Sequence, residues 1–107
     1  MYPAYLKERE GVDVLEKPYG FATYKFREND CYIVDIYVTP EKRRLGLASQ
    51  LADEISEIAR ASGYRVLTGS VDVRDKRHGE NAATLLAYGM RPYTQEGYIT
   101  YFVKELT

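Results

Sequence analysis

The alternation of hydrophobic and polar residues in the first third of the chain predicts a β-hairpin. Phe21–Phe26 alternates aromatic residues with small or polar ones, as a half-buried strand does. Cys31–Val38 is almost continuously β-branched or aromatic, which predicts a central strand. The polar run Arg27–Asp30 between them predicts the turn. Val12–Leu15 predicts a further short strand, whereas Met1–Gly11 has no pattern that predicts an element.

Beyond Val38 the hydrophobic period becomes helical. Leu47, Leu51, Ile55 and Ile58 follow spacings of three and four residues, which predicts an amphipathic helix that Gly46 opens and Gly63 ends. The rest of the chain predicts, in order, a strand at Arg65–Val73, a charged loop at Arg74–Gly79, a short helix at Asn81–Tyr88, a break at Gly89–Tyr93 and a strand at Tyr98–Lys104. Because helices and strands alternate, we expect an α/β fold with a mixed central sheet flanked by helices, in one domain over residues 1–107.

Composition narrows the classes of function. Lys and Arg number 15 and Asp and Glu 16, so the net charge of -1 does not favour a nucleic-acid partner. The sequence has no apolar run long enough for a bilayer and no secretory signal pattern, so we expect a cytoplasmic protein without membrane contact. The single cysteine, Cys31, has no internal disulfide partner and is interpreted as a small core residue. We expect no metal ion.

The segment 38–48 carries the most informative chemistry. A strand ends at Val38, the basic run Lys42, Arg43 and Arg44 follows, and Gly46 precedes the long helix. Backbone N–H groups at a helix start have no intrahelical partner, and the helix dipole adds to their attraction for an anion. Glycine lets the backbone approach a bulky anion closely. The alternative is an ordinary strand-to-helix connection with charged residues on its surface.

The chain resembles the GNAT superfamily of acyl-CoA N-acyltransferases in two motifs, which follow each other in the same order as in that family. Val38, Pro40 and Arg43–Ala48 match the family's strand end and its Arg/Gln-x-x-Gly-x-Gly/Ala signature. Asn81 with Tyr88 seven residues later matches the second signature. The likeness covers about residues 31–105 and implies the GNAT fold, with reduced N-terminal helices.

Two positions depart from the family pattern. Ala48 stands at the second glycine, a change that the family often shows. The pair Pro92-Tyr93 stands where the family has Gly-Phe at the start of a strand, so the turn after the short helix differs. The residues before Val12 are also too few for the two helices that cover the acceptor site in the family.

The resemblance implies transfer of an acetyl group from acetyl-CoA to an amine. The backbone N–H groups of the helix start would bind the pyrophosphate, and the pantetheine arm would pair with the central strand like an added strand, beside a family bulge that opens the sheet. The Val38 N–H would polarise the thioester carbonyl, and Asn81 would fix the cofactor arm. The cofactor-binding set is then Ile36, Val38, Arg43, Arg44, Leu45, Gly46, Leu47, Ala48, Ser49 and Asn81.

Two residues are the candidates for proton transfer. Tyr88 would donate its proton to the leaving thiolate, since a phenol is neutral at pH 7; the alternative is a core ring that packs the short helix. Asp35 would act as the base or bind a cationic acceptor, with a solvated or Arg-paired carboxylate as the alternative. His78 is interpreted as a solvated loop residue, with a general base as the minor alternative.

The sequence therefore predicts an N-acetyltransferase for an amine acceptor, such as a protein lysine or N-terminus. One alternative is an acyl-CoA-binding module with little or no catalysis. Another is an interaction module, in which the strand Tyr98–Lys104 would add to the sheet of another chain and form, for example, a homodimer.

Overall fold

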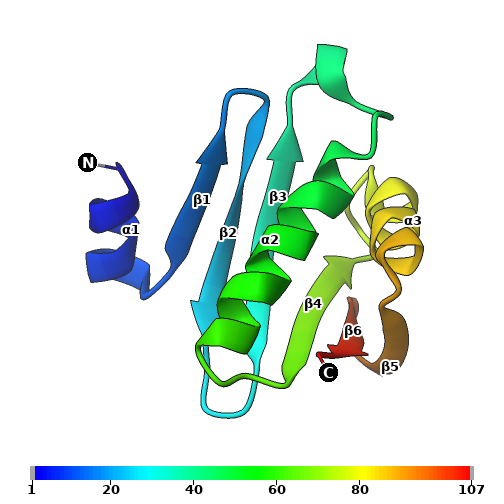
Figure 1. Cartoon of the computed structure of the whole chain (residues 1–107). Coiled ribbons are helices and arrows are strands. Elements are labelled where there is room, and N and C mark those ends of the chain that lie inside the picture. The colour runs from blue at the N-terminus through cyan, green and yellow to red at the C-terminus, as the bar shows by residue number, and fades with distance from the viewer. Residues whose placement is uncertain (1, 107) are drawn as a thin grey trace.

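The computed structural model describes residues 2–106 and contains one six-stranded mixed sheet in the order β1-β2-β3-β4-β6-β5 (Figure 1). The elements are α1 (Tyr2–Glu10), β1 (Asp13–Lys17), β2 (Gly20–Phe26), β3 (Cys31–Val38), the 3-10 turn η1 (Pro40–Lys42), α2 (Leu47–Ala61), β4 (Val66–Asp72), α3 (His78–Tyr88), β5 (Arg91–Glu96) and β6 (Ile99–Glu105). The predicted mixed sheet flanked by helices is confirmed, and the fold is of the α+β kind.

The predicted hairpin is present, and it contains a bulge. Strands β2 and β3 pair antiparallel, and β3 has the predicted bounds. Thr23 pairs with Asp35 whereas Tyr24 pairs with Ile33, so Val34 is an extra residue on β3. A bulge of this kind bends the strand and redirects the side chains that follow it.

Helix α2 lies across one face of the sheet and supplies much of the core (Figure 1). Leu51 and Ile55 are fully buried, and burial of such side chains contributes roughly 1.5–3 kcal/mol each. Gly46 and Gly63 flank the helix with left-handed backbones, at φ 77° and 88°, as the sequence predicts for its two ends. None of the helices in residues 2–106 is both long and apolar enough to span a bilayer.

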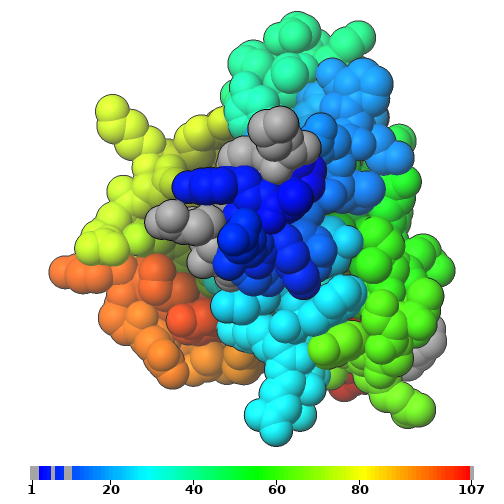
Figure 2. Space-filling model, turned by 90° about the vertical axis from the view of Figure 1, so that its left-hand side faces the viewer, coloured from blue at the N-terminus to red at the C-terminus, as the bar shows by residue number. Residues whose placement is uncertain are grey.

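The N-terminal segment forms helix α1, which the sequence pattern did not predict. Its low amphipathicity explains the omission, because a helix without an apolar stripe gives no periodic signal. Gly11 ends α1 in a left-handed conformation and donates its N–H to the Lys7 carbonyl. The Lys7 ammonium also pairs with Asp13 at 3.1 Å, so contacts with the start of β1 hold the helix. Figure 2 shows α1 on the outside of the sheet, between the η1 segment above and the 27–30 turn below.

Three predictions about the C-terminal half were wrong in detail. Helix α3 begins at His78 rather than Asn81, because the turn before it folds back on the Asp75 carbonyl, which accepts the His78 N–H. The predicted break at Gly89–Tyr93 overlaps strand β5, whose six residues are all exposed and therefore show no alternation. The interaction-module alternative requires the last strand to add to the sheet of another chain. Strand β6 instead lies between β4 and β5, so it is an interior strand and β5 is the free edge at that side.

Candidate functional site

Six consecutive backbone amides at the start of α2 have no hydrogen-bond acceptor among residues 2–106. Within residues 2–106, the backbone N–H groups of residues 44–49 donate to no acceptor, and the first helical bond is Gln50 N–H to Gly46 O at 3.1 Å. Arg44 and Gly46 both have left-handed backbones, at φ 66° and 77°. Leu47, Ala48 and Ser49 form the first turn, and Leu45 is 62% exposed. Unpaired amides at a helix start beside basic side chains suit a phosphate group.

Strand β3 separates from its neighbour β4 where the family resemblance places the pantetheine arm. Strands β3 and β4 are parallel but pair at only two positions, Cys31 with Leu67 and Tyr32 with Thr68. Residues 33–38 of β3 and 69–72 of β4 do not pair with each other, and we call this region between the two strands the divergence. It leaves one side of β3 free for another extended chain.

The backbone of β3 determines which groups face the divergence. The Thr39 N–H bonds the Tyr19 carbonyl, so residues 39, 37 and 35 direct their backbone groups toward β2. The intervening Ile36 and Val38 therefore direct their N–H and C=O groups toward β4. Consistent with this, the Val38 carbonyl accepts a bond from Arg43 Nε at 3.0 Å. Arg43 is thus held between the end of β3 and the unpaired amides.

Tyr88 lies at the end of α3, and its side chain contacts the neighbouring helix α2 on the same face of the sheet. Its side chain is 9% exposed, and its hydroxyl donates to the Ala52 carbonyl at 3.1 Å and also bonds the Ser56 hydroxyl. Lys104 on β6 places its ammonium 4.0 Å from the centre of the Tyr88 ring and donates to the Tyr88 carbonyl at 3.0 Å. Burial raises the pKa of the Tyr88 phenol, which keeps its proton in place at neutral pH.

The surroundings of Tyr88 include residues that the sequence pattern did not single out. Ser56 lies on the buried side of α2, and Lys104 follows the apolar run Tyr101–Val103 of β6. A serine on the apolar stripe of a helix and a lysine in a half-buried strand are the signals that mark them. The hydroxyl of Tyr88 points to α2, so its placement fits a packing role as well as the predicted role of proton donor.

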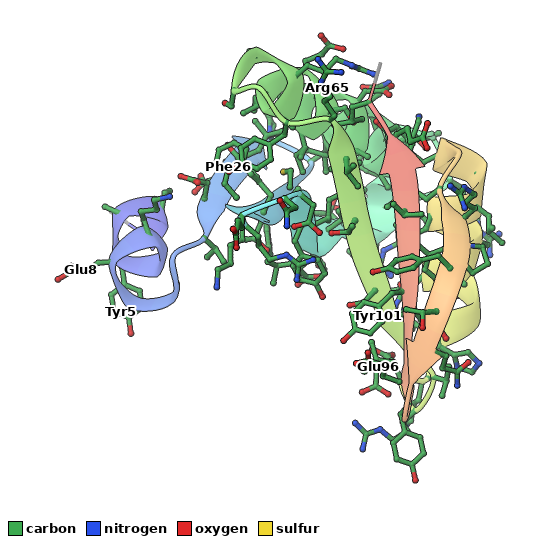
Figure 3. The ribbon with its side chains drawn as sticks, turned by 90° about the horizontal axis from the view of Figure 1, so that it is seen from below. Tyr5, Glu8, Phe26, Arg65, Glu96 and Tyr101 are labelled. Carbon is green, nitrogen blue, oxygen red and sulfur yellow. The ribbon has the colours of Figure 1, made fainter. Side chains whose placement is uncertain are left out.

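Asp35 lies immediately after the bulge, on the face of β3 that is turned away from α2. Its side chain is exposed and makes no hydrogen bond or ion pair with residues 2–106. Tyr88 and the helices α2 and α3 are on the opposite face of the sheet, so the two predicted proton-transfer residues approach the divergence from opposite sides. Tyr101 and Glu96 belong to the same uncovered face as Asp35, and Figure 3 shows both of them turned away from α3.

The remaining candidates lie near the surface or deep in the core. Asn81 is exposed in the first turns of α3. His78 is exposed at the start of that helix, with Nδ1 donating to the Asp75 carbonyl at 2.8 Å. Cys31 is fully buried, and burial raises the pKa of its thiol to about 12, as expected of an inert core residue. Groups of metal-ligating side chains are absent from residues 2–106.

Comparisons with known proteins agree with this arrangement. The model of the acetyltransferase (GNAT) family matches residues 4–82. Curated protein sequences give no significant match. An acetyltransferase from Thermus thermophilus superposes with a TM-score of 0.78 at 19% identity, over 96% of this chain and 70% of that one. PaiA N-acetyltransferase from Thermoplasma acidophilum, in complex with coenzyme A, gives 0.76 at 16% identity, over 94% and 65%.

A smaller protein shares the same architecture. The anti-CRISPR protein AcrVA5 superposes with a TM-score of 0.70 at 19% identity, over 84% of this chain and 96% of that one. By contrast, the chain spans about two thirds of the length of the Thermus and Thermoplasma proteins. At these identities the structures show the fold, and the family model covers about three quarters of the chain. The divergent strands, the unpaired amides at the start of α2 and the family match together place this chain in the GNAT acetyltransferase family.

Proposed function

We propose that the protein is an acetyl-CoA-dependent N-acetyltransferase that acts on a primary amine. The observation that carries the proposal is the juxtaposition of the six unpartnered amides of residues 44–49 with the free side of β3. One end of this arrangement fits a pyrophosphate, and the other fits an extended amide-bearing arm. The coenzyme A complex of the Thermoplasma structure, which has the same fold, supports this assignment.

The residues of the helix start would hold the phosphates. The amides of Arg44 to Ser49 donate hydrogen bonds, while the side chains of Arg43 and Arg44 supply positive charge. The bond from Arg43 to the Val38 carbonyl fixes the direction of that guanidinium before any ligand arrives. Asn81, at the start of α3, would bind the arm from the other side of the divergence.

The free backbone groups of β3 would position the thioester. The Ile36 groups pair with the arm, and the Val38 N–H donates to the carbonyl oxygen that becomes negatively charged as the amine attacks. The amine nitrogen forms a bond to the carbonyl carbon, and the carbon–sulfur bond breaks. Tyr88 gives its proton to the departing thiolate, and Asp35 takes the proton that the amine nitrogen loses, directly or through water.

The acceptor side of the sheet is exposed near the bulge of β3. Helix α1 contacts β1, whereas the central strands keep Val34 and Tyr37 exposed at 46% and 39%. An uncovered, shallow face admits an amine carried on a large molecule more readily than it encloses a small one. We therefore propose a lysine side chain or an N-terminus of a protein as the acceptor, in a reducing, cytoplasmic setting.

One observation favours a second function, the binding of acyl-CoA without efficient catalysis. The Tyr88 hydroxyl is engaged by Ala52 and Ser56 on α2. If that engagement persists when coenzyme A is bound, Tyr88 does not reach the sulfur and acts only in packing. Turnover, rather than binding, distinguishes the two functions.

Calorimetry with acetyl-CoA tests the cofactor site directly. We expect micromolar or tighter binding by the wild type and at least a tenfold weaker Kd, about 1.4 kcal/mol, for Arg44→Glu and for Gly46→Glu. The control is Arg65→Glu, which makes the same charge change as Arg44→Glu beyond the C-terminal end of α2 (Figure 3) and should bind normally. A folded wild type that does not bind acetyl-CoA would contradict the proposed function.

A further inference from the structure

A pair of hydroxyl groups crosses between β3 and β4 at the closed end of the divergence. The Tyr32 hydroxyl on β3 lies 2.5 Å from the Ser70 hydroxyl on β4. Tyr32 pairs with Thr68 and is the last β3 residue that pairs with β4, whereas Ser70 lies two residues further along β4, where pairing has stopped. The hydroxyl pair therefore spans the separating strands at the point where they begin to part.

The bulge brings this pair and Asp35 onto one face of the sheet. On β2, Lys25 pairs with Tyr32 and Thr23 pairs with Asp35, and residues two apart on a strand share a face. Without the extra residue Val34, the spacing of three between Tyr32 and Asp35 would place them on opposite faces. Both thus lie on the face turned away from α2 and α3, where Asp35 makes no hydrogen bond or ion pair within residues 2–106.

Neighbouring groups hold Tyr32 in place. The Arg27 guanidinium lies 4.5 Å from the centre of the Tyr32 ring, and Arg27 is itself paired with Asp30. Asp30 also accepts a bond from the Thr68 hydroxyl at 2.9 Å. The tyrosine ring is thereby fixed between a cation on one side and Ser70 at its tip, which is the preorganisation expected of a binding residue.

We propose that the Tyr32–Ser70 hydroxyl pair, together with Asp35, binds the acceptor amine at the closed end of the divergence. A primary amine arrives as an ammonium ion with three N–H donors and needs hydrogen-bond acceptors around it. The two hydroxyl oxygens and the Asp35 carboxylate supply such acceptors from adjacent strands on the face that α2 and α3 leave uncovered. The inference rests on the proposed function, because it assigns the acceptor side of the same site.

Nuclear magnetic resonance tests this assignment without the need for turnover. The probe is Nα-acetyl-lysine methylamide, titrated into the complex of the full chain with coenzyme A to concentrations that detect a Kd of about 1 mM. We expect chemical-shift changes at the amides of Tyr32, Asp35 and Ser70. Tyr32→Phe and Ser70→Ala should each weaken the response at least fivefold, and the double variant should do little more than either single one.

The control is Tyr98→Phe, which removes a phenol hydroxyl at the β5–β6 turn and should bind the probe as the wild type does. Coenzyme A binding by each variant is measured first, so failure of the proposed function is recognised separately from failure of this inference. Shifts confined to other regions, no shifts at all, or an undiminished response in both Tyr32→Phe and Ser70→Ala would overturn the assignment.

Discussion

Replacement of Tyr88 by phenylalanine separates the catalytic role of this residue from its packing role. The substitution removes one hydroxyl and keeps the buried ring. Tyr88 loses its bond to the Ala52 carbonyl and its contact with Ser56, but Ser56 keeps its own bond to Ala52 O at 2.9 Å. No acceptor is therefore left unsatisfied, and the loss of net hydrogen bonding should lower the free energy of unfolding by about 1 kcal/mol.

The expected effect on turnover is larger. General acid catalysis contributes typically about 10²- to 10⁴-fold, which corresponds to roughly 3–5.5 kcal/mol of transition-state stabilisation. A stability loss of about 1 kcal/mol leaves almost all molecules folded and has no such effect on kcat. Urea unfolding measures the loss of stability, and calorimetry measures the Kd for acetyl-CoA. The rate at which the coenzyme A thiol is released gives kcat. We expect a kcat at least 100-fold lower with Kd within about threefold of the wild type.

Ser56→Ala is the matched control. It removes the same hydroxyl contact from the other side while retaining the phenol, so its stability should fall by about 1 kcal/mol and its kcat by only a few-fold. A kcat of Tyr88→Phe within threefold of the wild type would refute the assignment of the phenol as proton donor. Tyr88 would then be a packing residue, and the acyl-CoA-binding alternative would gain support.

Further predictions concern stability and reactivity. Gly20→Ala should lower the free energy of unfolding by more than about 2 kcal/mol, because the new Cβ would lie 2.0 Å from a backbone carbonyl oxygen of β3. Gly79→Ala, with no atom within 4 Å of the new Cβ, should raise it by about 0.5 kcal/mol, and urea unfolding of the pair measures both. Hydrogen bonding to Arg27 lowers the pKa of Asp30, so the stabilisation is present above the ordinary pKa near 4 and is lost as pH falls through the lowered value. Asp30→Asn should therefore be less stable than the wild type, by up to about 1 kcal/mol, in urea unfolding at pH 7, and the difference should disappear at pH 2; a difference that persists there would contradict this cause. The buried Cys31 should react with a thiol reagent at pH 8 only after unfolding, and reaction of the native protein would show that the core opens.

The sequence by itself determined the elements whose pattern is local. The β-branched run of β3, the period of α2 and the two glycines that flank it gave the bounds of the central unit, because side-chain burial and positive φ leave a direct trace in residue type. The unpaired amides beside Gly46 follow from the same local features. The segments without such a trace were missed: α1 has no apolar stripe, and β5 is exposed along its whole length. Their structure comes from contacts with β1 and β6.

The arrangement around the divergence was decided only by the tertiary structure. The sequence named Tyr88 and Asp35 but could not place them on opposite faces of the sheet, because that depends on how α3 packs and on the extra residue at Val34. The contact between Tyr32 and Ser70 joins residues 38 positions apart. Such a pair has no pattern in the sequence, since it arises only where two parallel strands begin to separate, and that point is determined by the packing of the whole sheet.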